Sequence, residues 1–201
     1  MMYSTIKRIK NKLLYNRISP VTIENPNRMN WHEDFIVELA KVVKPRVYCE
    51  LGLYQCTLFN RILPYADKLI GVDIEKSAGE YMKNSSKTEF FNLSTDEFIE
   101  YIKTASIQID MLFIDADHSK ESVLNDFNNF FPFVTPHGLI LLHDSHPKDE
   151  EQCKSGYCGT GYQAIEELSR TKDEYEMMTI PVPPGLTICR KRKVQLAWME
   201  E

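Results

Sequence analysis

Acidic and imidazole side chains follow two apolar segments in the second half of the chain. They are Asp115, Asp117 and His118 after residues 109–114, and His143 and Asp144 after residues 139–142. The carboxyl ends of strands in a parallel sheet meet at one edge, where ligands bind, so we expect these groups to lie together. Carboxylate oxygens suit a hard cation such as Mg²⁺, which lowers the pKa of a coordinated hydroxyl. A nearby imidazole can then accept the proton.

A purely structural interpretation of the same residues is that Asp117 and Asp144 cap loops and that His143 is a packed, hydrogen-bonded histidine. That interpretation would suffice for an isolated pair. Five such groups at the ends of two neighbouring strands favour a chemical site.

The elements around these groups alternate between helical and strand patterns, which predicts a doubly wound α/β fold with helices on both faces of a mostly parallel seven-stranded sheet. The expected strands are Val47–Leu51, Lys68–Ile74, Glu89–Asn92, Ile109–Ile114, Leu139–Leu142, Tyr175–Ile180 and Leu186–Cys189. The expected helices are Asn30–Val43, Thr57–Leu63, Ala78–Asn84, one capped by Ser94 or Thr95 and ending near Thr104, Lys120–Phe131 and Tyr162–Ser169. The short connection between the last two strands predicts an antiparallel hairpin at the C-terminal edge.

Two further positions could bind a ligand at the ends of the first two strands. Gly52 lets the backbone turn tightly, and the following helix points its amides toward the same place. The segment lacks a complete G-x-G-x-x-G, which argues against a dinucleotide site. Asp73 ends the second strand and can accept hydrogen bonds from ribose hydroxyls. It could also serve as a turn residue, but Glu50 and Gly52 upstream favour the ribose role.

Composition narrows the class of protein. The chain has 201 residues, 43% hydrophobic and 26% charged, which is typical of a soluble domain. A net charge of -5 argues against a nucleic-acid partner. No apolar run predicts a membrane span or a secretory signal. The odd number of scattered cysteines, 5, favours a reduced, cytoplasmic protein, and loop residues Cys153 and Cys158 match no tight zinc motif.

The predicted domain covers residues 30–201 and is preceded by a basic extension, residues 1–29, with apolar residues at helical spacing. This extension could contact a membrane surface or a partner, or pack as an amphipathic helix. The run Arg190–Lys193 is interpreted as the solvated end of a strand. Trp31 and His32, at the start of the first domain helix, could line a cleft, although packing at the helix start is the simpler role.

From Trp31 to Arg190 the chain resembles the class I S-adenosylmethionine-dependent methyltransferases, which have a Rossmann-like fold. Residues 50–56, Glu-Leu-Gly-Leu-Tyr-Gln-Cys, are similar to the first motif of that family, in which Gly52 would lie beside the methionine part of the cofactor. Asp73 matches the acid that holds the ribose, and Ser94 belongs to a loop that lines the adenine. The resemblance therefore implies a cofactor site at Glu50, Gly52, Tyr54, Asp73, Ser94 and Asp115.

Residues 113–119 and 141–144 are similar to the branch that includes sugar and macrolide O-methyltransferases and cephalosporin-biosynthesis relatives. That resemblance implies that Asp115 and Asp144 bind Mg²⁺, that His118 is the general base and that His143 is a further ligand or an orienting group. The chain departs from the family pattern where Cys56 replaces a glycine and His143 replaces an acid. Another divalent cation, or no metal, therefore remains an alternative.

The function implied is methyl transfer to a hydroxyl of a sugar, glycan precursor or natural product, with His118 and Asp115 as catalytic residues. The glycine-containing loop Lys148–Gly161 could be a lid over the acceptor, or a plain surface loop. Two alternatives are a non-catalytic cofactor-binding or scaffold protein and, on the same fold, a nicotinamide-dependent oxidoreductase. The sequence leaves open which acceptor is methylated. It also leaves open whether the protein forms a homo-oligomer.

Overall fold

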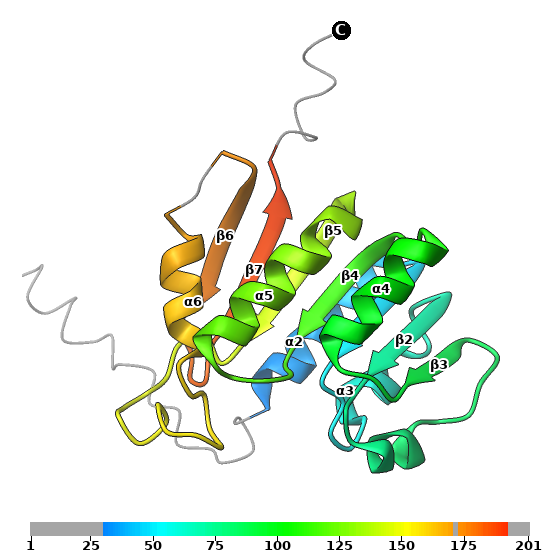
Figure 1. Cartoon of the computed structure of the whole chain (residues 1–201), viewed down its shortest axis with the longest axis horizontal. Coiled ribbons are helices and arrows are strands. Elements are labelled where there is room, and N and C mark those ends of the chain that lie inside the picture. The colour runs from blue at the N-terminus through cyan, green and yellow to red at the C-terminus, as the bar shows by residue number, and fades with distance from the viewer. Residues whose placement is uncertain (1–29, 171–172, 193–201) are drawn as a thin grey trace, which may run out of the picture. The chain divides into compact units, whose positions relative to one another are not determined.

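The structure is a computed structural model that describes residues 30–170 and 173–192 (Figure 1). Contacts divide the chain after Trp31, and the unit that begins at His32 contains the sheet and its helices. The predicted extension, residues 1–29, lies outside the described residues. Within the described part, no helix is both long and apolar enough to span a membrane.

A seven-stranded sheet in the order β3-β2-β1-β4-β5-β7-β6 forms the centre of this unit (Figure 1). The first five strands along the chain pair in parallel, and β7 pairs antiparallel with both β5 and β6. The predicted fold class is therefore confirmed, including the C-terminal antiparallel hairpin. The strands are β1 Val47–Leu51, β2 Lys68–Val72, β3 Thr88–Phe91, β4 Ile109–Ile114, β5 Val134–His143, β6 Tyr175–Ile180 and β7 Leu186–Lys191.

Helices cover both faces of the sheet, as Figure 1 shows, with α4, α5 and α6 on the near face. The helical elements are α2 Trp31–Val43, α3 Thr57–Ile62, η2 Lys76–Tyr81, α4 Thr95–Ala105, α5 Lys120–Phe130, η3 Phe131–Phe133 and α6 Gly161–Leu168. On the near face, Phe98, Phe127 and Phe130 pack with the strand residues into one apolar cluster. The predicted cap of α4 is confirmed, because the Ser94 hydroxyl accepts from the Glu97 amide and the Glu97 carboxylate accepts from the Ser94 amide.

Three predicted elements differ from those observed. β2 ends at Val72 because Asp73 already turns to accept backbone amides. The weak helix predicted at residues 78–84 is a 3₁₀ turn, η2, whose Gly79 lies so close to the Phe90 ring that an added Cβ would be 2.5 Å from it. β5 starts five residues early, at Val134, and contains a register shift opposite Ile109 and Met111.

The chain changes direction across the sheet between β1 and β4. From β1 it proceeds outward to β2 and β3, and it then returns so that β4 pairs with the other side of β1. Ligands bind at such topological switch points, outside the carboxyl ends of the strands. The ends of β1, β2, β4 and β5 are the positions that carry the predicted site residues.

Candidate active site

The turn after β1 brings the backbone of Gly52 against the end of β4. Gly52 has φ +86°, and a Cβ at this position would lie 2.2 Å from the Asp115 carbonyl oxygen. Only glycine fits both the conformation and the space. Gly52 therefore serves first to let the β1–α3 turn pass directly over Asp115.

The same turn holds Tyr54 and Cys56 in the left-handed region, with φ of 48° and 53°. The departure at Cys56 is accommodated because its side chain is buried away from the turn, where Sγ donates to the Ala78 carbonyl at 3.3 Å. Burial raises the pKa of this thiol to about 12. Cys56 is thus a protonated packing residue beneath the loop.

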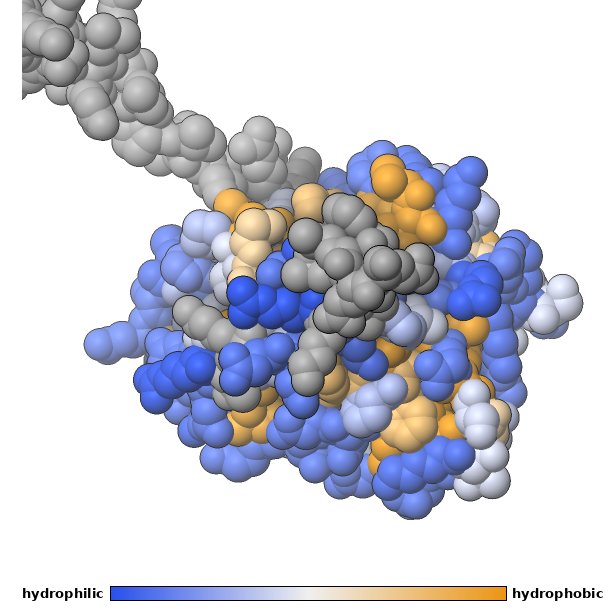
Figure 2. Space-filling view, turned by 90° about the horizontal axis from the view of Figure 1, so that it is seen from above, coloured by the Kyte–Doolittle hydropathy of each residue, from blue (hydrophilic) through white to orange (hydrophobic). Residues whose placement is uncertain are grey.

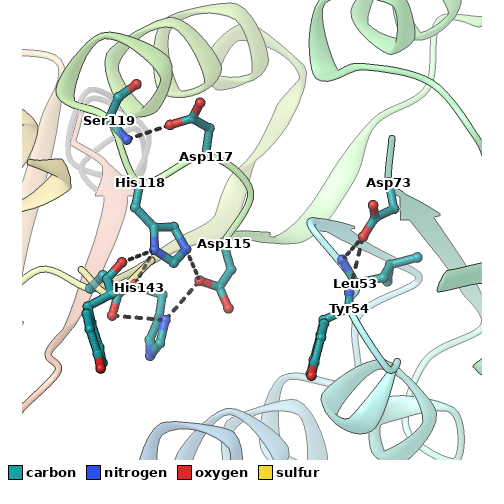
Figure 3. A network of polar contacts seen from close by, with 10 residues as sticks. Leu53, Tyr54, Asp73, Asp115, Asp117, His118, Ser119 and His143 are labelled. Atoms are coloured by element: carbon teal, nitrogen blue, oxygen red, sulfur yellow. Dashed lines mark hydrogen bonds and ion pairs between the residues drawn. The ribbon is translucent and has the colours of Figure 1, made fainter. Parts of the chain in front are cut away.

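The Asp73 carboxylate stabilises this turn from below. Its Oδ2 accepts from the amides of Leu53, at 2.8 Å, and Tyr54, at 3.1 Å (Figure 3), and its Oδ1 accepts from the amide of Glu75 at 2.8 Å. A carboxylate offers about four lone-pair positions, so three amides leave capacity for a further hydroxyl donor. Both the turn role and the ribose role are therefore compatible with this geometry.

A cleft with an open volume of about 450 Å³ lies between the turn, the start of α2 and the end of β4. Its lining includes the predicted residues Glu50, Gly52, Tyr54 and Asp115, together with His32, Glu33, Gln55, Thr57 and Phe113. Glu50 is buried and accepts from the Tyr48 hydroxyl at 2.5 Å. Burial raises the pKa of Glu50 well above its usual range, and this overrides the lowering by Tyr48.

Four side chains from the ends of β4 and β5 form one polar network beside the cleft (Figure 3). Oδ1 of Asp115 lies 2.8 Å from Nδ1 of His143 and 3.4 Å from Nε2 of His118. Oδ2 of Asp144 lies 2.9 Å from Nδ1 of His118. The sequence prediction that acids and imidazoles at two strand ends come together is thus met by the geometry, whereas Asp117 turns aside to accept from the Ser119 amide at 2.7 Å.

Comparison with known proteins finds a partial match to one protein family. Residues 49–145 match the family model described as a methyltransferase domain. The matched segment covers a little under half of the chain. The match begins within β1 and ends just after Asp144, so it contains the whole Asp/His network.

Solved structures share the fold of this chain. The O-methyltransferase TomG of Streptomyces achromogenes, involved in tomaymycin synthesis and solved with S-adenosylmethionine, has a TM-score of 0.67 at 14% identity, covering 80% of this chain and 79% of that one. An O-methyltransferase of Bacillus cereus, solved with S-adenosylhomocysteine, has a TM-score of 0.67 at 13% identity, covering 94% of this chain and 91% of that one. At such identities the likeness establishes the fold alone.

Among curated sequences, protein R132 of Acanthamoeba polyphaga mimivirus is 35% identical over 111 residues, which cover 48% of this chain. The aligned part spans half, 50%, of that protein's length. The description of R132 states no activity.

The side chains of the Asp/His network shift one another's pKa values. Two hydrogen-bonded carboxylates, Asp115 and Asp144, raise the pKa of His118 to about 11. The pKa of Asp115 is held well below its usual value: burial opposes this, but the His143 and His118 imidazoles outweigh it. Burial lowers the pKa of His143, yet the neighbouring Asp115 brings the net shift upward. In this arrangement His118 is held as a protonated imidazole between two carboxyl groups.

A possible cation site is formed by Asp115, His118 and Asp144. One ligand atom from each lies within 4.8 Å of the others. The group contains His118 where the sequence interpretation placed His143, whose Nδ1 is already directed at Asp115. Two carboxylates and one imidazole form a mixed oxygen and nitrogen set, which suits Mn²⁺, Fe²⁺ or Zn²⁺ better than Mg²⁺.

The loop 148–161 lies against His118 through its backbone. The Tyr157 carbonyl contacts Nδ1 of His118, and the Thr160 amide donates to the His118 carbonyl at 3.0 Å. The Thr160 hydroxyl accepts from the Lys120 amide at 2.9 Å. Gly159 fits closely, because a Cβ there would lie 2.6 Å from the His118 carbonyl oxygen. The C-terminal part of the predicted lid is therefore docked on the network.

The predicted site residues differ in how they relate to the cleft. Glu50, Gly52, Tyr54 and Asp115 line it, whereas the Ser94 hydroxyl is occupied in the α4 cap. Sequence reasoning underestimated His32, which is buried to 7% exposure, lines the cleft and places its ring 4.0 Å from the ring of His143, centroid to centroid. The sequence feature that could have indicated a place in the cleft is the position of His32 at the start of a helix, and this position equally predicts simple packing.

Proposed function

We propose that the protein is an S-adenosylmethionine-dependent methyltransferase that methylates a hydroxyl of a small-molecule acceptor, of the sugar, glycan-precursor or natural-product class. The observation that carries the proposal is the cleft beneath the Gly52 turn, which opens directly beside the Asp115 network. The family match and the fold shared with two O-methyltransferases solved with the cofactor or its product support it.

The cleft has the features that such a cofactor requires. The ribose hydroxyls would reach the remaining acceptor capacity of Asp73, and the amino-acid end would lie near Glu50 and Gly52. The acidic side chains of Glu33 and Asp115 beside the cleft suit a ligand that carries an ammonium and a sulfonium. Because the sulfonium is already an activated leaving group, the protein must mainly align the acceptor oxygen with the methyl carbon and remove its proton.

Asp115 connects the cofactor cleft with the residues that would remove the proton, since it lines the cleft and contacts the imidazoles of His118 and His143. We assign the base to His118. Both of its ring nitrogens face carboxylates, so His118 must first lose a proton before it can accept one from the acceptor. The longer contact, 3.4 Å from Nε2 to Asp115, is the one that an incoming hydroxyl can replace.

If a divalent cation binds, Asp115, His118 and Asp144 would hold it. The cation would lower the pKa of the acceptor hydroxyl. His143 would then orient Asp115 through their 2.8 Å contact. Turnover measured with EDTA, and after adding back Mn²⁺, Zn²⁺ or Mg²⁺, tests this part. Turnover that is insensitive to EDTA would refute the cation.

Calorimetric titration with S-adenosylhomocysteine and with NAD⁺ tests the cofactor. We expect binding of S-adenosylhomocysteine alone. Binding of NAD⁺ alone would favour the oxidoreductase, and the absence of S-adenosylhomocysteine binding would overturn the proposal. A screen of sugar, glycan-precursor and phenolic acceptors with radiolabelled S-adenosylmethionine then separates an enzyme from a cofactor-binding scaffold.

A further inference from the structure

Loop 148–161 contains two cysteines that differ in their access to solvent. Cys153 is half-buried, and its thiol donates to the Asp149 carbonyl at 3.5 Å. Cys158 is only 2% exposed. Both are free thiols. The remaining cysteines of the chain are all buried away from this loop: Cys49, Cys56 and Cys189. The loop therefore pairs one accessible thiol with one shielded thiol.

A tight turn separates the two cysteines and reverses the chain between them. The Tyr157 amide donates to the Lys154 carbonyl at 3.2 Å, which closes a four-residue turn. Gly156 occupies the third position of this turn with φ +88°, the conformation that a type II turn requires there. Cys153 and Cys158 directly flank the closed turn, and their thiols lie near enough to influence each other electrostatically.

The turn is compatible with a disulfide between its two flanking residues. Disulfides join Cα atoms about 4.4–6.8 Å apart, and the two ends of a closed four-residue turn lie within about 7 Å of each other. The turn has room to adjust, because a Cβ at Gly156 would meet nothing within 4 Å and residues 154–157 are all exposed. Joining the two sulfurs thus requires movement of an exposed turn and leaves the sheet in place.

Cys158 also connects this turn with the Asp/His network. Its thiol donates a hydrogen bond to the Asp144 carboxylate. The residues on either side of it hold the loop on His118, through the Tyr157 carbonyl and through the close fit of Gly159. A Cys158 sulfur that is bonded to the other cysteine would have to turn away from Asp144.

We propose that Cys153 and Cys158 form a redox modification site, at which hydrogen peroxide oxidises the two thiols to an intramolecular disulfide. The more accessible Cys153 reacts first: its sulfur takes one peroxide oxygen and becomes a sulfenic acid, and the other oxygen leaves as water. The Cys158 sulfur then attacks the Cys153 sulfur, and the hydroxyl leaves with the Cys158 proton as a second water. Two thiols and one peroxide thus give one disulfide and two waters. The inference goes beyond the proposed function and does not depend on it.

Oxidation at this site should loosen the loop from the network. The Asp144 carboxylate loses its thiol donor, and the segment that carries the Tyr157 carbonyl is drawn toward position 153. In the reduced protein the Thr160 amide donates to the His118 carbonyl at 3.0 Å, so hydrogen exchange at this amide reports the change.

The test treats the full chain with hydrogen peroxide, blocks the remaining thiols and digests the protein with trypsin without reduction. Lys154 lies between the two cysteines, so trypsin cleaves between them and only a disulfide keeps the two peptides together. Cys153→Ser and Cys158→Ser remove one partner each. Cys56→Ser is the matched control, since a hydroxyl can keep the hydrogen bond to the Ala78 carbonyl. Thermal unfolding verifies that each variant folds.

We expect peroxide to produce the linked peptides 149–154 and 155–170 in the wild type and in Cys56→Ser, and dithiothreitol to separate them. Neither Cys153→Ser nor Cys158→Ser should give this product. Exchange at the Thr160 amide should become about tenfold faster on oxidation of the wild type, the loss of roughly one hydrogen bond, and should not change in Cys153→Ser. Oxidation of Cys153 to the sulfinic acid without a linked peptide, or a disulfide that joins a different pair, would overturn the inference. A linked peptide with unchanged Thr160 exchange would overturn the coupling of the site to His118.

Discussion

Under the proposed function, Asp73 combines two tasks at a single carboxylate. It receives three backbone amides, which fix the turn over Asp115, and it retains an acceptor position for a ligand. The sequence could reveal an acid at the end of β2, but it could not reveal that the acid is also the support of the neighbouring turn. The two roles can be separated because Oδ2 serves the Leu53 and Tyr54 amides, whereas hydroxyl binding depends on the charge and on Oδ1, which also accepts from the exposed Glu75 amide.

The substitution Asp73→Asn should lower the affinity for S-adenosylhomocysteine about tenfold while reducing thermal stability only slightly, because one amide oxygen remains for Leu53 and Tyr54. Calorimetry and thermal unfolding measure the two effects. Glu75→Gln, in the exposed segment after Asp73, is the matched control. An affinity equal to that of the wild type would refute the ribose role.

Asp126 on α5 is a buried acid outside the candidate site. Its burial should make the stability of the protein depend on pH. It is 2% exposed, and burial raises its pKa to about 6 from an ordinary value of 3.8. The folded state thus prefers the protonated form. Ionising the buried Asp126 carboxyl lowers the free energy of unfolding. This loss is absent below pH ~4, develops as the pH rises through about 6, and is complete above that value.

Asp126→Asn should therefore increase the free energy of unfolding by ~2 kcal/mol at pH 8 and by almost nothing at pH 4. Denaturant unfolding at the two pH values measures this, with Glu121→Gln on the exposed side of the same helix as control. A gain of the same size at both pH values would show that packing, rather than ionisation, is responsible.

At the scale of elements, the periodic patterns predicted all seven strands, most clearly where burial on both faces of the parallel sheet leaves a largely apolar segment such as Ile109–Ile114. The patterns were wrong where side-chain contacts override propensity. Gly79 against Phe90 forces a 3₁₀ turn in place of a helix, and the segment at Pro136 and Gly138 hides the first half of β5. The partners of His118 and His32 could not be predicted either, since they depend on a loop and a helix brought in from elsewhere.

Loop 148–161 offers a direct comparison of two glycines. Gly156 and Gly159 have φ of +88° and +56°, but a Cβ at Gly156 would meet nothing within 4 Å, whereas one at Gly159 would meet the His118 carbonyl. Gly159→Ala should open the loop, and Gly156→Ala should cost only backbone strain of ~1 kcal/mol.

Hydrogen exchange at the Thr160 amide, which donates to His118, reports the opening. We expect much faster exchange in Gly159→Ala than in Gly156→Ala. Similar exchange in both variants would mean that the contact with His118 does not hold the loop.

At the scale of the whole molecule, every residue of the candidate site lies in the unit that begins at His32. The strands, both helical layers and the cleft are formed by residues 32–192. The change of direction between β1 and β4 gathers residues distant in sequence, from His32 to Asp144, at one edge of the sheet.

A fragment comprising residues 30–201 should consequently fold and bind S-adenosylhomocysteine with the affinity of the full chain. Circular dichroism, thermal unfolding and calorimetry test this. A fragment that folds but binds at least tenfold more weakly would show that residues 1–29 contribute to the cofactor site.

The docking of loop 148–161 on His118 has a consequence for how this chain can diversify. The contact at position 157 is made by a main-chain carbonyl, which any amino acid supplies, while the Tyr157 side chain is 56% exposed. Under the proposed function, substitutions at this position would change the surface beside an acceptor without disturbing the His118 contact beneath it. Acceptor selectivity and proton transfer would then vary independently at this one residue.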